Sequence, residues 1–113
     1  MLTVYGIKTC DTVMKALKWL DAEGIAYTFF DLRADGLTAE MAARWVDALG
    51  WESVLNRRST TWRELSDTDK EGLDAAKVVR LLVSYPTLVK RPVIEKNALI
   101  VNGFSDAVRA MLV

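Results

Sequence analysis

The sequence of 113 residues has no histidine, a single cysteine and a net charge of zero, with 15 basic and 15 acidic residues. The lack of histidine excludes catalytic dyads and triads that use an imidazole base, and it excludes zinc and haem sites with histidine ligands. One cysteine can form neither an intramolecular disulfide nor a cluster of thiolates around a metal. We therefore expect no metal and no bound cofactor. Because nucleic-acid-binding domains are usually clearly basic, we also expect no nucleic-acid partner.

No run of 18 apolar residues occurs, and the first residues do not resemble a signal peptide, because no basic segment precedes a long apolar one. We therefore expect no membrane partner. A lone cysteine without a disulfide framework is typical of a reducing compartment, which predicts a cytoplasmic protein. The length and the apolar content of 51% predict a single domain over residues 1–113. The predicted elements leave no apolar stripe unexplained, which favours a monomer.

The first part of the chain predicts a β–α–β unit. Leu2–Tyr5 is an apolar run that ends at Gly6, which is typical of a strand. In Asp11–Glu23 the apolar residues recur at helical spacing before Gly24, and Ala26–Asp31 is an aromatic-rich second strand. Two strands joined by such a helix are expected to pair in parallel.

The rest of the chain predicts a helical segment, a hairpin and a last helix. The expected elements are a helix from Thr38 to about Leu49, mixed turns over 51–72, a helix over 74–84, strands at 93–96 and 99–101, and a helix over 106–112. The order βαβ followed by ββα is that of a thioredoxin-like α/β domain with a mixed sheet. A helical insert of about 36–85 then lies between the two halves of one domain, and the four tryptophans are expected to pack in the core and the insert.

A candidate nucleophile, Cys10, lies where the first predicted strand gives way to the first predicted helix. The positive end of the helix dipole and the neighbouring Lys8 both favour a thiolate over a thiol. The unpaired N–H groups of the first helical turn can also hold an oxyanion. In the alternative interpretation Cys10 is a small buried apolar residue, but its polar neighbours favour the nucleophile. The candidate anion-binding residues beside it are Lys8, Thr9, Asp11 and Thr12.

Two arginine-containing segments are further candidates for anion binding. Arg91 precedes Pro92 at the start of a predicted strand, and its planar guanidinium suits a tetrahedral oxyanion or a carboxylate. The proline indicates either an ordinary edge-strand start or a cis-proline turn. Residues 56–63 contain three arginines with hydroxyl side chains between them, which indicates recognition of an anion or partner, or else a solvated basic surface. The residues alone favour solvated side chains in both segments.

Four segments, in this order and spacing, resemble the ArsC/Spx family, and in particular its YffB-like branch of small bacterial proteins. They are YGIKTCDTVMKALKWL at 5–20, LGWESVLNRRSTTWREL at 49–65, LVKRPVI at 88–94 and NGFSD at 102–106. The resemblance covers essentially the whole chain. It implies a thioredoxin-like fold with a helical insert, in agreement with the predicted order of elements.

The resemblance also implies roles for individual residues. In the arsenate reductases of this family, one cysteine in the first loop attacks arsenate, glutathione resolves the adduct and glutaredoxin restores the thiol. Cys10 takes the place of that nucleophile. Arg91 takes the place of the oxyanion-binding arginine before a cis-proline, so Pro92 is expected to be cis. A second family arginine falls on Arg57 or Arg58, and the YffB-like pattern favours Arg58.

The chain departs from the family pattern in two places. The reductases have a third arginine after the last hairpin, where this chain reads Asn102–Asp106. The loss of one charged hydrogen bond is expected to weaken arsenate binding by about 1.5–3 kcal/mol, or roughly ten- to a hundredfold. The Spx-type regulators have a CxxC redox pair, whereas the second position of that pair is Val13 in this chain.

The sequence thus predicts an enzyme, a thiol-dependent oxidoreductase similar to arsenate reductases. In this hypothesis the Cys10 thiolate attacks an oxyanion or a mixed disulfide, glutathione is the co-substrate, and glutaredoxin is a further partner. The alternative is an Spx-like regulatory module that binds RNA polymerase without turnover. The arginine-rich segment 56–63 favours the alternative, whereas the missing CxxC pair and the neutral charge favour the enzyme.

Overall fold

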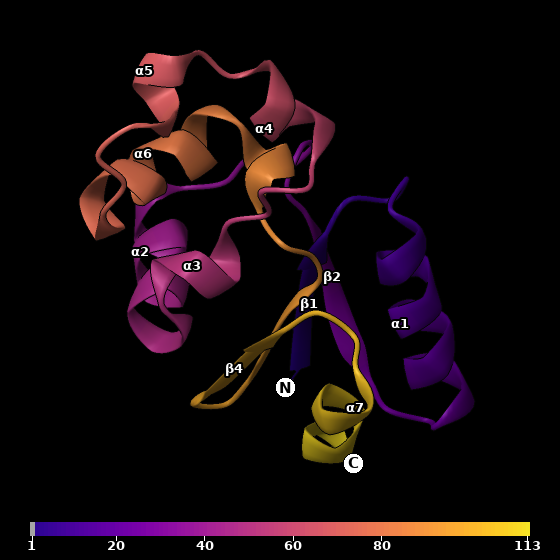
Figure 1. The fold of residues 1–113 in the computed structure, drawn as a ribbon. Coiled ribbons are helices and arrows are strands. Elements are labelled where there is room, and N and C mark those ends of the chain that lie inside the picture. Colours follow the sequence, from indigo (N-terminus) through magenta and orange to yellow (C-terminus); the bar gives the residue numbers. More distant parts are fainter. Residues whose placement is uncertain (1) are drawn as a thin grey trace. The chain divides into compact units, whose positions relative to one another are not determined.

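The computed structural model describes residues 2–113. The chain divides into two compact units, whose elements are drawn in Figure 1. Unit 1 joins the N-terminal segment up to Gly36 to Arg91–Val113, and unit 2 is Leu37–Lys90. Unit 2 includes nearly all of the predicted insert of about 36–85. The single domain over the whole chain stays a prediction.

Unit 1 is built on a four-stranded mixed sheet, which confirms the predicted thioredoxin-like order. Its strands are β1 (Leu2–Gly6), β2 (Tyr27–Asp31), β3 (Val93–Lys96) and β4 (Leu99–Asn102), in the spatial order β2-β1-β3-β4. β1 pairs in parallel with β2 and antiparallel with β3, and β3 pairs antiparallel with β4. The two helices are α1 (Asp11–Ala22), between β1 and β2, and α7 (Asp106–Leu112), after β4.

Both helices of unit 1 pack on the same face of this sheet. Val4, Ile94 and Val101 are register partners on three neighbouring strands. They form one buried cluster with Leu20 of α1 and Leu112 of α7. Each fully buried aliphatic side chain of this kind contributes about 1.5–3 kcal/mol to stability. The cluster therefore fixes α1 against the sheet.

The C-terminal end of α1 follows the glycine signal in the sequence. Gly24 has a φ of 69°, a left-handed conformation that glycine adopts without steric cost. Its N–H donates to the Asp21 carbonyl (3.2 Å), and the Ile25 N–H donates to the Leu20 carbonyl (3.0 Å). These two bonds make a Schellman motif and confirm the predicted end of the helix.

Unit 2 is helical. Its elements are α2 (Ala39–Leu49), α3 (Trp51–Val54), α4 (Thr60–Glu64), α5 (Asp67–Lys70), α6 (Ala75–Ser84) and a 3₁₀ turn at Pro86–Leu88. The side chains of Thr38 and Asp74 accept hydrogen bonds from the first turns of α2 and α6, which confirms both predicted helix starts. Trp45 of α2 is fully buried, as are Val78 and Leu82 of α6. Trp45 therefore packs in the core, as expected.

Gly6, the last residue of β1, has no room for a side chain. A methyl group on its Cα would lie 2.7 and 2.9 Å from the two γ-methyl carbons of Val13 in α1. We expect Gly6→Ala to lower the free energy of unfolding by about 1–3 kcal/mol, the usual cost of overpacking, as measured by urea unfolding. Val13→Ala removes both methyl groups, so the double variant should lose less than the sum of the single variants. Strictly additive losses would contradict the contact.

Candidate functional site

Three connecting segments of unit 1 meet at one edge of its sheet. Gly6 is opposite Asp31 in the parallel register, and Tyr5 is opposite Val93 in the antiparallel register. The loop after β1, the turn after β2 and the segment before β3 therefore lie at the same edge. Cys10 belongs to the first segment and Arg91 to the third. The sheet thus brings the predicted nucleophile and the predicted oxyanion-binding arginine to a common edge.

Cys10 is the N-cap residue of α1 and ends a short turn. Its N–H donates to the Ile7 carbonyl (3.0 Å), and its own carbonyl accepts from the Met14 N–H (3.0 Å). The side chain is a half-buried free thiol that makes no cap hydrogen bond. The caps of α2 and α6, in contrast, use a side-chain oxygen. The first N–H groups of α1 therefore lack a side-chain acceptor at the place where the thiol lies.

The four predicted anion-binding residues around Cys10 are all exposed. Lys8 and Thr9 form the turn before it, and Asp11 and Thr12 begin α1. The side chain of Asp11 carries a negative charge that would repel an anion, so its useful group is the backbone N–H. The role of all four residues in anion binding stays a prediction.

The peptide bond between Arg91 and Pro92 is cis, as expected. Pro92 is buried, and its carbonyl accepts from the Gly103 N–H (2.9 Å), which ties this turn to the segment after β4. Arg91 is half-buried. Its Nε atom is buried and makes no hydrogen bond to a residue of the described chain, while the side chain has other interactions. Its role as an oxyanion-binding group stays a prediction.

A buried carboxylate outside the predicted set of site residues lies at the same edge. Asp31, the last residue of β2, is 9% exposed. Its Oδ1 atom accepts from the N–H groups of Arg33 (2.8 Å) and Ala34 (3.0 Å). The bond from Ala34 is the largest cause that holds the pKa of Asp31 below its ordinary value of 3.8, against the opposing effect of burial. The N–H groups of Arg33 and Lys8, and the charge of Lys8, lower this pKa further.

These contacts make part of the stability depend on pH. Because the pKa of Asp31 is lower in the folded than in the unfolded chain, its ionised form stabilises the fold above the unfolded value, and this contribution is lost as the pH falls through the folded value. We expect Asp31→Asn to lower the free energy of unfolding at pH 7, and the difference from wild type to shrink as the pH falls from 7 to below the ordinary value of 3.8. Urea unfolding across this range measures it, and a difference independent of pH would contradict it.

In unit 2 the arginine-rich segment lines a pocket of about 430 Å³. Its lining residues are Glu52, Leu55, Asn56, Arg57, Arg58 and Lys90. The Asn56 side chain accepts from the Arg58 N–H (3.0 Å), and the Arg57 guanidinium lies over the Trp51 ring at 5.2 Å from its centroid. Three cations against one carboxylate make the pocket positive. Both Arg57 and Arg58 line it, so the preference for Arg58 stays a prediction.

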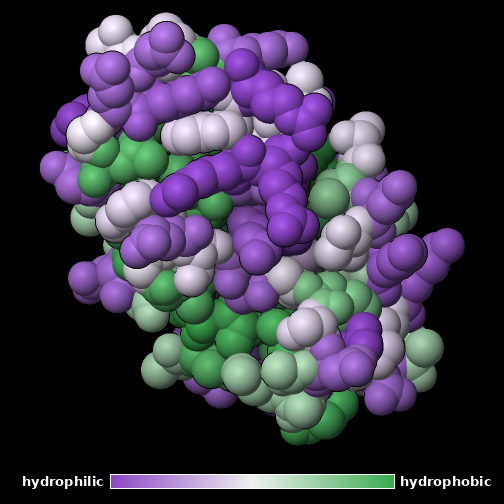
Figure 2. Space-filling model, in the orientation of Figure 1, coloured by the Kyte–Doolittle hydropathy of each residue, from purple (hydrophilic) through white to green (hydrophobic). Residues whose placement is uncertain are grey.

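The surface of unit 2 is also polar beyond this pocket. Figure 2 shows hydrophilic side chains gathered over α4 and α5 on the face that it draws. The Ser59 side chain accepts from the Trp62 N–H (3.1 Å), and the Lys70 ammonium lies 5.6 Å from the centroid of the Trp62 ring. Trp51 and Trp62 are thus half-buried beneath cationic groups and pack within unit 2.

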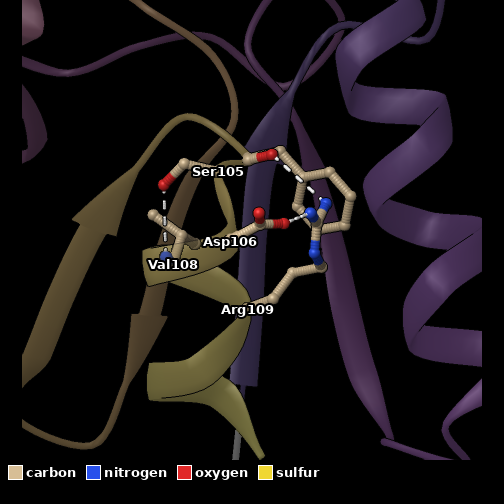
Figure 3. Close-up of polar contacts among 5 residues, drawn as sticks. Ser105, Asp106, Val108 and Arg109 are labelled. Carbon is tan, nitrogen blue, oxygen red and sulfur yellow. Dashed lines mark hydrogen bonds and ion pairs between the residues drawn. The ribbon is translucent and has the colours of Figure 1, made fainter.

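The family's third arginine falls in the segment Asn102–Asp106 of this chain, which leads into α7 and contains no arginine. Figure 3 shows Arg109, the next arginine along the chain, turned toward this segment. It forms an ion pair with Asp106, its Nη1 atom donates to the Phe104 carbonyl (3.5 Å), and its guanidinium lies 4.9 Å from the centroid of the Phe104 ring. The Ser105 side chain caps α7 by accepting from the Val108 N–H (3.3 Å). Arg109 is therefore engaged within its own helix end.

Residues 2–113 contain neither a candidate metal site nor a candidate membrane span. No group of three or more histidine, cysteine, aspartate or glutamate side chains in this range could hold a metal ion. None of the helices described there is long and apolar enough to span a bilayer.

The fold and the site define a class of thioredoxin-like α/β proteins with one thiol at the start of the first helix and a cis-proline turn at the same sheet edge. The model of the ArsC family matches residues 5–111, and the chain belongs to the ArsC family. This confirms the resemblance found in the sequence.

Individual relatives agree with this assignment. The solved structure of a protein called YffB is 43% identical, covers 100% of both chains and has a TM-score of 0.96. An arsenate reductase (ArsC) related protein from Brucella melitensis is 42% identical, with 97% of this chain and 92% of that chain covered and a TM-score of 0.78. Global transcriptional regulator Spx 1 of Bacillus cereus is 28% identical over 116 residues, with 99% of this chain and 87% of the relative covered.

Proposed function

We propose that this ArsC-family protein is a thiol-dependent reductase in which the Cys10 thiolate attacks the substrate. The observation that carries the proposal is the position of Cys10 as the N-cap of α1, without a side-chain cap, at the sheet edge that also holds Arg91. The helix dipole and the first N–H groups of α1 favour a neighbouring anion. The 42% identity to an arsenate reductase related protein supports the same chemistry.

The proposed substrate is a glutathione mixed disulfide or an oxyanion such as arsenate, with glutathione as co-substrate. In the disulfide reaction, the Cys10 thiolate attacks the glutathione sulfur, the S–S bond breaks, and the substrate leaves as a thiolate. Free glutathione then attacks the Cys10–glutathione disulfide, which releases oxidised glutathione and restores the Cys10 thiolate. This second thiol must come from outside, since the chain has one cysteine. A reducing, glutathione-rich compartment such as the cytoplasm would supply it.

Glutathione and arsenate are both anions, which fits the cationic side chains of the candidate site. In this proposal Arg91 and Lys8 hold the anion beside the thiol. Arg58 lines the positive pocket of unit 2, and we propose that it binds an anion there. Because the third family arginine is missing, we expect a mixed disulfide to be a better substrate than arsenate. Glutaredoxin is the expected partner for regeneration of the thiol after oxyanion reduction.

Alkylation by iodoacetamide tests the proposal, since the label can react with one thiol only. We expect Cys10 to react faster at pH 7 than free glutathione does. Arsenate, sulfate or S-methylglutathione, which has no free thiol, should slow the reaction by occupying the anion site. The ion that protects best identifies the ligand class. An alkylation rate equal to that of glutathione, together with no protection, would overturn the proposal.

Arg91→Ala should weaken this protection. The variant loses a charge-assisted hydrogen-bond donor, so the anion concentration for half-protection should rise about ten- to a hundredfold. Arg109→Ala is the matched control, because that arginine is engaged with Phe104 and Asp106 in α7. Wild-type protection in both variants would show that Arg91 does not bind the anion.

The second candidate function is an Spx-like regulatory module that binds RNA polymerase without turnover. The positive pocket of unit 2 and the 28% identity to global transcriptional regulator Spx 1 favour it. Val13 at the second position of the CxxC pair disfavours a redox switch of that type. Stoichiometric retention of RNA polymerase from a bacterial extract, with no thiol turnover, would favour this function over the reductase.

A further inference from the structure

Gly6 differs from the other glycines of the chain in the reason why it must be glycine. The chain has six glycines, and the other five have φ between 59° and 84°, with nothing within 4 Å of the place where a Cβ atom would lie. Gly6 has no positive φ, and its added Cβ atom would meet the Val13 side chain. The side chain of Val13 therefore takes the space that a side chain of residue 6 would need.

Gly6 and Val13 are the two ends of the stretch that carries Cys10. Gly6 ends β1, and Val13 is a fully buried residue in the first turn of α1. Between them, the Cys10 N–H donates to the carbonyl of Ile7, which is 4% exposed, and the Cys10 carbonyl accepts from the Met14 N–H. The contact between the two ends thus closes the loop, and the two backbone bonds fix Cys10 within it.

We propose that Gly6 and Val13 are positioning residues for Cys10. Their contact sets where α1 starts against the end of β1, and so where the thiol lies relative to Arg91 at the same sheet edge. Neither side chain has a group that could take part in the reaction, so both act through Cys10. The inference deepens the proposed function, since it rests on Cys10 as the nucleophile and Arg91 as an anion-binding group.

A methyl group on residue 6 should displace the start of α1. It would lie 2.7 and 2.9 Å from the γ-carbons of Val13 and 3.3 Å from its Cβ atom. Carbon atoms in good contact are about 3.5–4.0 Å apart, so the helix start must move by about 0.5–1 Å. Rotation of the valine gives little relief, because χ1 has one strongly preferred value in a helix and leaves Cβ in place. Such a shift exceeds the tolerance of about 0.5 Å for a preorganised site.

The experiment measures how much sulfate half-protects Cys10 against iodoacetamide in four variants. Gly6→Ala overfills the contact and Val13→Ala empties it, so each should raise this concentration about tenfold, below the hundredfold that a misplacement of about 1 Å can cost. In the double variant the methyl group on residue 6 refills the space, so the concentration should return to within about threefold of wild type. Val108→Ala is the matched control, because it makes the same truncation at a buried position of α7, outside the loop.

The double variant separates positioning from stability. It has lost two buried methyl groups of Val13 and stays less stable than wild type, yet its protection should recover. If Gly6 and Val13 served stability alone, every folded variant would be protected like wild type, and this result would overturn the proposal. Weak protection in Val108→Ala, or no recovery in the double variant, would overturn it as well. Val13→Ala and the double variant decide the matter even if Gly6→Ala fails to fold.

The amide chemical shift of Cys10 reports its position without any ligand. The shift should change in Gly6→Ala and return toward the wild-type value in the double variant, because the Cys10 N–H is bonded to Ile7 beside the altered residue. An unchanged shift in Gly6→Ala would overturn the proposal. If no anion protects wild-type Cys10 and it reacts no faster than glutathione, the reductase function fails, while the amide shift still decides whether the contact positions Cys10.

Discussion

Cys10→Ser is expected to lose reduction of a glutathione mixed disulfide by more than about a thousandfold. A serine hydroxyl is hardly ionised at pH 7 and forms no disulfide, and the chain has no second cysteine to replace the thiol. The formation of oxidised glutathione at a fixed glutathione concentration measures the loss. Turnover by Cys10→Ser above the spontaneous exchange between glutathione and substrate would exclude Cys10 as the nucleophile.

The matched control for this variant is Met14→Leu. Met14 lies one turn further along α1 and is 40% exposed, so a leucine of similar size should leave turnover unchanged. Serine is close to cysteine in size, and the Cys10 side chain makes no cap hydrogen bond. The thermal unfolding of Cys10→Ser should therefore match that of wild type. A matching fold with absent turnover would assign the effect to chemistry rather than to stability.

Trp45→Ala should cost the most stability of any single change considered. The Trp45 side chain is the largest among the fully buried ones of the described chain. Its truncation leaves a cavity and is expected to lower the free energy of unfolding by about 3–5 kcal/mol, a large part of the 5–15 kcal/mol typical of whole domains. Urea unfolding followed by far-UV circular dichroism measures this loss.

Val83→Ala is the control for Trp45→Ala within the same unit. Val83 lies on α6 and is 37% exposed, so its truncation should change the free energy of unfolding by less than about 0.5 kcal/mol. A loss of under 1 kcal/mol for Trp45→Ala, or equal losses for both variants, would contradict the central position of Trp45.

The elements of the fold were predictable because their signals are local. Thr38, Asp74 and Ser105 each mark a helix start by a side-chain oxygen that accepts a backbone N–H of the first turn. Gly24 marks the end of α1 by its left-handed conformation. Such signals need only three or four neighbouring residues, so a sequence pattern contains them completely. The strands at 93–96 and 99–102 were likewise close to their predicted bounds.

Asp31 was not predictable as part of the site, although its local turn was. An aspartate after a strand, followed by Asp35 and Gly36, is a normal signal for a turn in which the carboxylate accepts neighbouring N–H groups. Its place beside the end of β1 depends on the parallel register that puts Gly6 opposite Asp31. A register between distant strands is a tertiary property. The sequence therefore indicated the turn and gave no sign that the turn lies beside the end of β1, from which the loop to Cys10 starts.

Unit 2 is one continuous stretch of chain, and this has a consequence for how the gene can change. Leu37–Lys90 connects β2 to β3, so the pairing of β1 with both of these strands depends on residues outside the stretch. The entropy of closing such a connection grows slowly with its length, so longer and shorter versions are tolerated. Recombination with two crossover points can therefore replace the whole stretch, including its arginines, by another sequence. The loop that ends at Cys10 lies outside this stretch and stays unchanged in the recombinant.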